Sequence, residues 1–434
     1  MNLTTKLSMR KRLLFAGLFF AAANYAQAQR TLIYCGKLID GVSDAAQEQT
    51  TIIVEKNRIT AVEKGYTKAL TGDKLIDLKN KTVLPGLTDM HVHIESETSR
   101  DQYLKRLSNN SADIAFEAQK HALTTLMAGF TAVRDLGGTG VNIALRNAIN
   151  KGLVTGPRIF TSGQTIATTG GHGDPTNGLS NMYSVPDKVT DAIVDSPDEG
   201  RKAVRQRYKD GSDCIKITAT GGVLSIAKSG KAPQFTENEI SAIVQTAKDY
   251  GFHVAAHAHG TDGMKRALRA GVTTIEHGTY MDDEAIELFK KMGAYYVPTI
   301  IAGRTAADSA KVPGYYHPFV RMKALEIGPL IQKTFEKAYK AGVKIAFGTD
   351  GGVYPHGKNA KEFEYMTEVG MPPIEAIKSA TVVPAQILGE QDNMGSITKG
   401  KYADIIATDE NPLQNIKTLQ NVTFVMKDGV VYKQ

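Results

Sequence analysis

Six side chains that can bind a metal ion recur at the ends of short apolar segments in this 434-residue sequence. They are His91, His93, Lys216, His257, His277 and Asp350. His91 and His93 are two residues apart, so on a strand both imidazoles project from one face and can reach one ion. A lone His-x-His pair is a weak signal, because a histidine at a strand end is often a hydrogen-bonded core residue. The recurrence of such residues at five separate segments is what indicates a metal site.

Two of the six also allow a purely structural interpretation. Asp350 precedes two glycines and could be a turn or helix-cap residue. Lys216 stands between two isoleucines, and alternation along a strand places it on the opposite face from them. Such an inward lysine could simply pair with a buried acid. Both residues count toward a metal site because the histidines accompany them.

The elements that must position these residues form a repeating pattern. Strand-like segments alternate with helical ones, and the eight expected strands are residues 83–93, 131–135, 158–161, 214–218, 253–257, 273–277, 294–298 and 344–349. Repeated βα units imply a parallel sheet, and eight of them predict a closed (β/α)8 TIM barrel, with a doubly wound open sheet as the alternative. Chemistry in a barrel lies at the C-terminal ends of the strands, where the candidate residues fall.

Short strand-like segments with turns also occupy both ends of the chain. Neither end has enough apolar residues for its own core, so we expect one small β-sandwich built from both. The expected organisation is a signal peptide at 1–28, the first part of the β-sandwich at 29–82, the metal-hydrolase barrel at 83–394 and the second part of the β-sandwich at 395–434.

The first 28 residues have the layout of a secretory signal peptide. Four cations without an acid precede the apolar run 13–23, and Ala26-Gln27-Ala28 offers a cleavage site of small residues. The apolar run is too short to span about 30 Å of hydrocarbon, so no stable membrane anchor is expected. The predicted product is exported, periplasmic or secreted, after cleavage near Ala28.

Charge and cysteine content narrow the classes of partner. The formal net charge falls from +7 to +3 when the four cations of the leader are removed, which is too weak to predict nucleic-acid binding. Cys35 and Cys214 fall in different expected domains, so no disulfide framework is predicted. Cys214 is expected to be a buried, reduced packing residue.

The segments around the six residues resemble the motifs of a known family. Residues 83–93, with the sequence Val-Leu-Pro-Gly-Leu-Thr-Asp-Met-His-Val-His, resemble the opening motif of the amidohydrolase superfamily. The remaining matches are Lys216 within 214–222, at the position of the carboxylated lysine, His257 within 253–260, His277 within 274–278 and Asp350 within 347–350. The resemblance covers essentially the whole mature chain. It is strongest to the imidazolonepropionase-like branch, which includes Xaa-Pro and Xaa-Arg/Lys dipeptidases and ochratoxin amidases.

The resemblance implies a centre of two divalent ions, for which zinc suits the imidazole and carboxylate donors. One ion is expected on His91, His93, Lys216 and Asp350, and the other on Lys216, His257 and His277. Lys216 is expected to carry a carbamate that bridges the two ions. A hydroxide shared by the ions would be the nucleophile. Asp350 would take its proton and pass it to the leaving amine.

Four further residues are candidates for contact with substrate. His172 lies in the glycine-rich loop 169–174, where it is either a donor to the tetrahedral oxyanion or an exposed loop histidine. The resemblance aligns His257 as the metal ligand and leaves His259 as a substrate contact, where dipeptidase relatives often have tyrosine. Ser225 follows Lys216 in a loop expected over the site. Arg304 is a candidate partner for a substrate carboxylate, or else a solvated charge.

The function expected from the resemblance is hydrolysis of an amide bond in a small carboxylate-bearing substrate. Dipeptides such as Xaa-Pro or Xaa-Arg/Lys and N-acyl amino acids, including ochratoxin A, fit this description. One alternative is cyclic amide hydrolysis of the imidazolonepropionase kind, which the carboxylated lysine disfavours. The other is a non-catalytic binding protein on the same fold, which the complete ligand set disfavours. Because relatives form homo-oligomers, often octamers, a homo-oligomer is expected.

Overall fold

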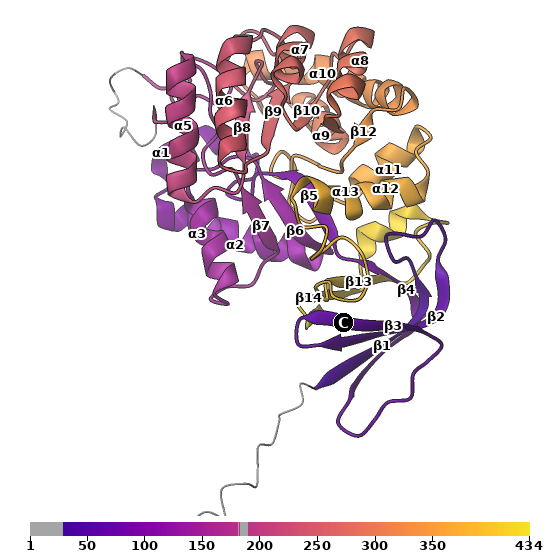
Figure 1. The fold of residues 1–434 in the computed structure, drawn as a ribbon. Helices are drawn as coiled ribbons and strands as arrows, with labels where there is room; N and C mark the ends of the chain where they lie inside the picture. The colour runs from indigo at the N-terminus through magenta and orange to yellow at the C-terminus, as the bar shows by residue number, and fades with distance from the viewer. Residues whose placement is uncertain (1–28, 181, 183–189) are drawn as a thin grey trace, which may run out of the picture.

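The computed structural model describes residues 29–180, 182 and 190–434 as a barrel joined to a sheet domain (Figure 1). The signal peptide predicted at 1–28 lies outside these residues. Within the described residues, no helix combines the length and apolar character needed to cross a membrane.

Eight parallel strands form the barrel. They are β5 (Leu87–Val92), β6 (Phe130–Asp135), β7 (Arg158–Thr161), β8 (Ile215–Thr218), β9 (Val254–Ala258), β10 (Thr274–His277), β11 (Tyr295–Val297) and β12 (Lys344–Ile345). They hydrogen-bond in two runs, β5-β6-β7 and β8 to β12 in order. Parallel bridges from Ile166 to Ile217 and from Val92 to Gly351 join the two runs at both ends. The predicted (β/α)8 barrel is therefore confirmed.

The last barrel strand is shorter than the sequence predicts. Only two residues of the predicted strand 344–349 pair regularly, because the segment changes partner. The Ala346 amide donates to the Tyr296 carbonyl at 3.0 Å, whereas the Phe347 carbonyl accepts from the Met90 amide at 2.9 Å. The segment thus passes from β11 to β5 and closes the ring.

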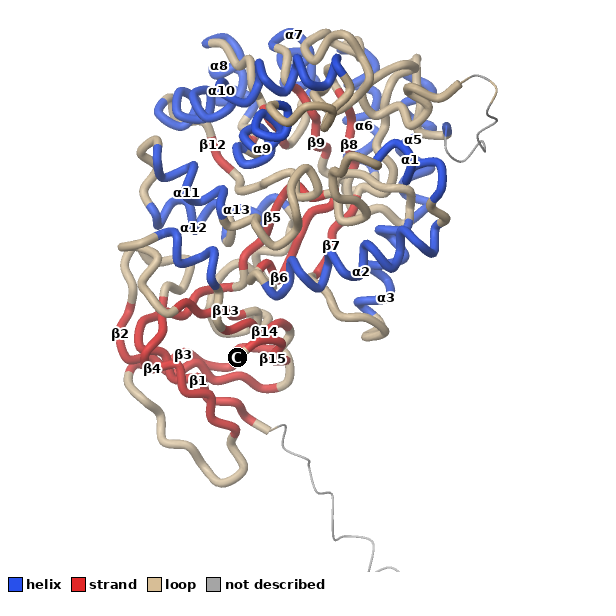
Figure 2. The backbone as a smooth tube through the Cα atoms, turned by 180° about the vertical axis from the view of Figure 1, so that it is seen from behind, coloured by secondary structure: helices blue, strands red, loops and turns tan. Residues whose placement is uncertain are grey.

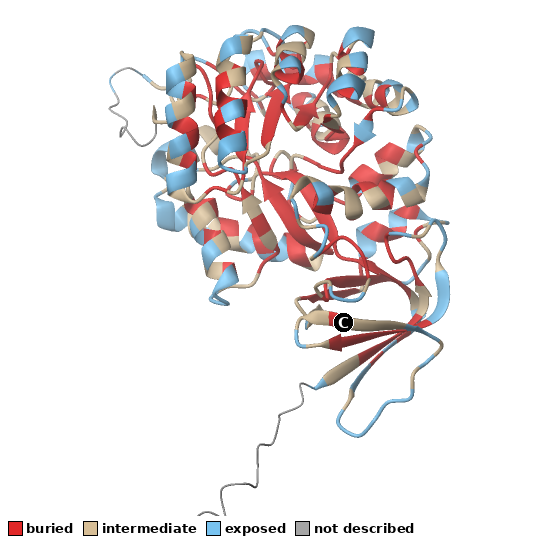
Figure 3. Ribbon diagram, viewed as in Figure 1, coloured by how far each residue is buried: buried red, intermediate tan, exposed pale blue. Residues whose placement is uncertain are grey.

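Helices surround the strands on the outside of the barrel (Figure 2). They are α1 (Gln102–Ser108), α2 (Ser111–Met127), α3 (Val141–Asn150), α5 (Pro197–Asp210), α6 (Glu237–Asp249), α7 (Thr261–Ala270), α8 (Asp283–Met292), α9 (Ile300–Ala310), α10 (Pro318–Lys340), α11 (Lys361–Glu368), α12 (Pro373–Ser379) and α13 (Val382–Ile387). A capping box begins α6, since Thr236 and Glu239 each accept the backbone N–H of the other. Buried residues line the strands and the inner faces of the helices (Figure 3).

The two ends of the chain build one mixed sheet of seven strands. These are β1 (Arg30–Leu38), β2 (Gln47–Glu55), β3 (Arg58–Lys64), β4 (Lys74–Pro85), β13 (Ile405–Thr408), β14 (Phe424–Lys427) and β15 (Val430–Lys433), with the 3-10 helix η1 (Ile416–Asn421) between β13 and β14. Their order is β15-β14-β13-β4-β1-β2-β3, so β4 lies between the N-terminal and C-terminal strands. Apolar residues from both ends, including Ile33, Leu78, Ile405 and Phe424, form one buried cluster. The predicted shared β domain is confirmed, with its strands hydrogen-bonded as one continuous sheet.

The boundary between sheet and barrel lies slightly later than expected. Strand β4 continues to Pro85 and β5 begins at Leu87. The strand expected at 83–93 is therefore divided between the terminal sheet and the barrel. At Gly86 between them, the amide donates to the Asp404 carbonyl at 2.8 Å. A Cβ at Gly86 would collide with the side chain of Thr131, so glycine permits this close passage.

The two cysteines lie in different bodies. Cys35 is buried in the core of the sheet domain, and Cys214 packs with Leu136 and Ala255 inside the barrel. Both are free thiols, in agreement with the sequence prediction. Burial raises the pKa of each thiol to about 12, which keeps both protonated and unreactive.

Candidate metal centre and active site

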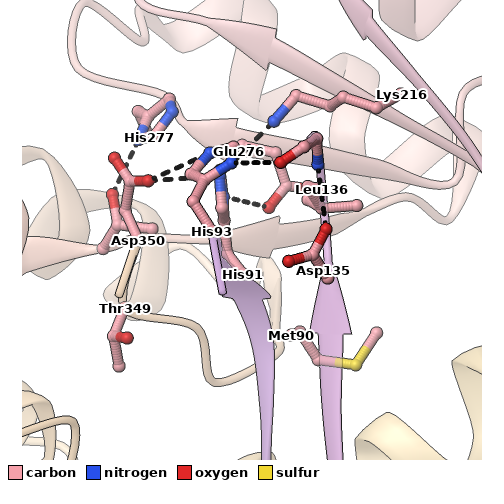
Figure 4. Close-up of polar contacts among 12 residues, drawn as sticks. Met90, His91, His93, Asp135, Leu136, Lys216, Glu276, His277, Thr349 and Asp350 are labelled. Carbon is pink, nitrogen blue, oxygen red and sulfur yellow. Dashed lines mark hydrogen bonds and ion pairs between the residues drawn. The ribbon is translucent and has the colours of Figure 1, made fainter. Parts of the chain in front are cut away.

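The predicted metal-binding side chains meet at the C-terminal end of the barrel (Figure 4). Oδ1 of Asp350 lies 3.5 Å from Nε2 of His91 and 3.4 Å from Nε2 of His93. Nζ of Lys216 lies 3.4 Å from the same Nε2 of His91. The ring centroids of His277 and His91 are 5.0 Å apart. The donors therefore crowd around a common volume without forming a short, well-matched ion pair.

His257 completes the group from β9. Its ring centroid lies 4.6 Å from that of His277. One potential ligand atom from each of His257, His259 and His277 lies within 4.8 Å of the other two. The same holds for His91, His277 and Asp350. Two overlapping donor groups thus share His277, and the structure brings all six predicted ligands together.

Each of the four predicted ligand histidines has one ring nitrogen occupied by the protein. The pairs are His91 Nδ1 with Glu276 Oε2 at 2.9 Å, His93 Nδ1 with the Gly137 carbonyl at 3.1 Å, His277 Nδ1 with Thr299 Oγ1 at 2.8 Å and His257 Nε2 with the Gly221 carbonyl at 3.1 Å. Such outer partners fix the tautomer and the ring orientation of metal-binding histidines. The second ring nitrogens of His91 and His93 face Oδ1 of Asp350 within the cluster.

A buried ion pair supports His91 from below. Both side chains of the pair, Arg134 and Glu276, are fully buried and 2.9 Å apart. Arg134 also donates through Nε to the Met90 carbonyl at 2.7 Å. Glu276 thus contacts Arg134 through Oε1 and holds the ring of His91 in place through Oε2. Sequence reasoning did not identify these two residues, although a charged residue inside each of two short apolar strands was a signal.

Burial sets the protonation of the cluster. It lowers the pKa values of His91, His257 and His277 well below the usual range, so these imidazoles are neutral and able to bind a metal. Burial also lowers the pKa of Lys216 to about 8. It raises the pKa of Asp350 to about 7, against the opposing effect of Lys216.

Two residues of the cluster adopt a backbone conformation that residues other than glycine rarely adopt. The φ angles are +71° at His277 and +59° at Asp350, both in the left-handed region. The Asp350 amide donates to the His91 carbonyl at 2.7 Å, which ties the strained residue to β5. Strain of this kind persists where the surrounding structure holds a side chain for function.

His172 lies in contact with the cluster. Its ring packs on that of His257 with centroids 4.3 Å apart, and its Nδ1 is buried with no hydrogen-bond partner among the described residues. The backbone N–H of His172 donates to Gln234 Oε1 at 2.8 Å, which holds the loop down. Burial lowers the pKa of His172 to about 3, so its imidazole is neutral.

His259 is closer to the donors than a remote substrate contact would be. Its ring stacks on His277 with centroids 4.8 Å apart. Nδ1 is bound to Thr279 Oγ1 at 2.8 Å, which leaves Nε2 for another partner. The geometry therefore allows a metal as well as a substrate at His259.

The structure does not bring Arg304 to this site. Its guanidinium contacts Gln332 at 3.0 Å and Glu368 at 3.1 Å, and it lies over the ring of Tyr365. These partners lie on the outer helices α10 and α11 and on the segment that follows β12. Helix α9 thus presents Arg304 to its helical neighbours, and its contact with a substrate carboxylate stays a prediction.

Ser225 lies near the site together with a residue that sequence reasoning missed. Ser225 is buried, and its hydroxyl is 3.4 Å from the Gly222 carbonyl. The missed residue is Lys323 of α10, whose Nζ donates to the carbonyls of Gly222 and Ser225, each at 2.8 Å. Lys323 falls on the buried stripe of its helix beside Val320 and Ala324, and a lysine in an apolar stripe was the available signal.

Residues 82–432 match the sequence profile of the amidohydrolase family. The chain is 32% identical over 433 residues to an ochratoxinase of Aspergillus niger, covering 95% of this chain and 88% of that protein. Among solved structures, it is similar to a Xaa-Pro dipeptidase with methionine bound in its active site. That similarity has a TM-score of 0.90 and 52% identity, and covers 94% of this chain and 100% of the other.

A second solved structure is a prolidase complexed with N-methylphosphonate-L-proline. The TM-score is 0.85 and the identity 31%, over 94% of this chain and 100% of the other. The likeness in each case extends over the barrel and the terminal sheet together, since nearly the whole described chain is covered.

Proposed function

Since this chain belongs to the amidohydrolase family, we propose that it uses two divalent metal ions to hydrolyse the amide bond of a small carboxylate-bearing substrate. The observation that carries the proposal is the set of four histidines at the strand ends, of which His91, His257 and His277 are buried and His93 is partly exposed. One ring nitrogen of each is held by a protein group.

The residues present fit a pair of metal ions. His91, His93 and Asp350 would hold one ion, and His257 and His277 would hold the other, with Lys216 between them as a carbamate. Neutral imidazoles and carboxylate oxygens are donors that zinc accepts. The chemistry that two bound divalent ions supply in such a site is polarisation of the substrate carbonyl and activation of water.

Asp350 is placed to move the proton of the reaction. Its carboxyl has a pKa raised to about 7 and is only partly exposed, so it can accept a proton and release it again near neutral pH. We assign Asp350 the transfer of a proton from the attacking water to the leaving amine. Oδ1 of this carboxylate already lies 3.5 Å from Nε2 of His91 and 3.4 Å from Nε2 of His93.

His172 is the proposed donor to the oxyanion. A neutral imidazole has one N–H and one acceptor nitrogen, and the loop at residues 169–174 brings it against His257. A donor aimed at the developing negative charge stabilises the transition state more than the substrate. The orphaned Nδ1 of His172 supports a role in which a ligand supplies the missing partner.

The substrate class is proposed from the relatives. The ochratoxinase, the Xaa-Pro dipeptidase and the prolidase are named for amide substrates with a free carboxylate, and we extend that class to this chain. A dipeptide or an N-acyl amino acid is the proposed substrate. Export after cleavage near Ala28 and assembly into a homo-oligomer complete the proposal.

A substrate screen tests the proposed function. The purified chain would be loaded with zinc and bicarbonate and assayed for release of free amino acid from Xaa-Pro, Xaa-Arg and Xaa-Phe dipeptides, N-acyl amino acids and ochratoxin A. We expect turnover of at least one class, loss with a chelator and recovery with zinc. Fewer than one bound divalent ion per chain, with no gain of activity on adding zinc and bicarbonate, would contradict the proposal and favour a binding protein. Turnover of cyclic amides alone would favour the imidazolonepropionase alternative.

A further inference from the structure

Lys323 is a buried cation with no matching acid. Its residue is 5% exposed, and no carboxylate of the described residues lies within ion-pair distance of its Nζ. Two of its three N–H groups donate to the carbonyls of Gly222 and Ser225. Carbonyl oxygens satisfy donors but do not neutralise a charge, and an uncompensated buried ammonium is costly. The third N–H and the net charge therefore remain for a ligand.

One loop connects this ammonium to the metal-binding cluster. The Gly221 carbonyl accepts from Nε2 of His257, and the next carbonyl, that of Gly222, accepts from Lys323. The α-carbon of Gly222 lies against the imidazole of His172, which a side chain there would strike. Lys323 and His172 therefore meet the same loop residue, and the ammonium lies beside the cluster.

The neighbouring groups named here do not neutralise the charge of Lys323. His172 meets the same loop residue, Gly222, and its imidazole offers no carboxylate that could pair with the ammonium. Lys231, farther along the same loop, is paired with Glu326 at 2.5 Å. The stem of Lys323 packs on Gly230, so its position is fixed from a second point of the loop.

We infer that Lys323 forms a carboxylate-binding subsite that orients the substrate beside the metal-binding cluster. The inference rests on the proposed function, whose substrates carry one carboxylate near the amide bond. A single ammonium matches one unit of negative charge, and a carboxylate would accept the hydrogen bond of the third N–H, which the two carbonyls leave unused. Because the same ammonium holds Gly222 and Ser225, binding of the carboxylate also fixes the loop that contacts His172.

A matched pair of substrates tests the subsite. The best dipeptide from the screen would be compared with its C-terminal carboxamide, which keeps the amide bond and removes the charge. We expect the wild type to prefer the acid, and Lys323→Met to lower kcat/KM for the acid by roughly 10- to 100-fold, the range for one charged hydrogen bond. The value for the carboxamide should stay nearly unchanged. Lys323→Arg should recover part of the preference.

Two controls separate a subsite from a structural lysine. Lys228→Met removes an exposed lysine of the same loop and should leave both substrates unaffected. An equal loss on acid and carboxamide in Lys323→Met would mean that Lys323 only holds the loop, and would overturn the inference. If Lys323→Met does not fold, the acid preference of the wild type and of Lys323→Arg decides the question.

The inference and the proposed function fail in distinguishable ways. A wild type that hydrolyses acid and carboxamide equally well overturns the subsite and leaves the amidohydrolase function in place. A metal-loaded wild type that hydrolyses no amide overturns the function. Calorimetric titration with L-phenylalanine and with L-phenylalaninamide then tests the subsite alone, and equal binding of the two to the wild type would overturn it.

Discussion

The mouth of the barrel and its junction with the terminal sheet both bury charged groups. The charged groups at the junction form short ion pairs, whereas those at the mouth do not. At the junction, Arg158 reaches Asp428 at 2.8 Å and Asp404 at 3.3 Å, and its guanidinium lies over the ring of Tyr402. At the mouth, the contacts of Asp350 with the histidines are no shorter than 3.4 Å.

The difference separates groups that hold the fold from groups kept for a ligand. A matched buried pair joins two parts of the chain, and losing one partner strands a charge. A crowded set of poorly matched donors contributes little to folding stability and is available to bind cations or substrate. Substitutions at the mouth should therefore change chemistry, and substitutions at the junction should change stability. Each prediction below tests that division.

The largest effect is expected for Lys216→Ala. Removing the amine removes the bridge between the two proposed ion sites, so bound metal and activity should both fall to background. Short carboxylic acids such as formate should restore part of the activity by taking the place of the lost carbamate. Elemental analysis and turnover measure the two quantities, and retention of both ions would contradict the carbamate bridge.

Asp350→Asn should come next, with turnover lowered by about 10⁴-fold, the upper end of the range for a positioned acid–base group. The amide keeps the shape of the side chain and removes a carboxyl that burial already penalises. The thermal midpoint should therefore not fall. Retained turnover would remove Asp350 from proton transfer, and a collapsed fold would break the division between mouth and junction.

Arg158→Ala should cost about 3–5 kcal/mol of unfolding free energy, because Asp404 is left buried without its partner. Activity per folded molecule should be unchanged. Denaturant unfolding measures the loss. Lys378→Ala is the matched control, since its ion pair with exposed Asp44 should contribute no more than about 1 kcal/mol.

His172→Ala should lower kcat by roughly 10²-fold, the scale of one lost oxyanion donor. The binding of a product amino acid should change much less. An unchanged kcat, measured at saturating substrate, would contradict the role of His172 as a donor to the oxyanion.

The smallest effect is expected for Arg304→Ala. Its guanidinium contacts partly exposed residues on the outer helices. The unfolding free energy should therefore change by about 1 kcal/mol or less, and kcat and KM should not change. Steady-state kinetics on the acid substrate provide the check. A clear rise in KM would restore Arg304 as a substrate contact.

Strand-borne features were accessible from the sequence. A ligand at the end of a strand is marked by its short apolar segment, and alternation fixes the face on which it projects, as for His91 and His93. The barrel and the shared terminal domain follow from the same local patterns. The choice between His257 and His259 as metal ligands cannot be made from these local patterns, because residues two apart on a strand lie on the same face.

Helix-borne residues were harder to place. Arg304 and Lys323 both lie on helices after β11, and sequence reasoning named only Arg304. Which face of α9 or α10 meets the barrel depends on how the two helices cross, and this is set by packing between distant segments. The buried stripe through Lys323 indicated an inward lysine, but only the fold shows that the loop at Gly222 lies above it.

The position of β4 in the terminal sheet has a consequence for synthesis. As the chain is made, β1 to β4 emerge first, and the edge of β4 that later pairs with β13 stays open until residues 405–408 arrive. An open strand edge invites pairing with other chains. A truncated product would carry that edge permanently and be marked for aggregation or degradation, whereas a finished chain covers it. Strands β13 to β15 thus cover the edge of β4 only after the whole barrel has been made.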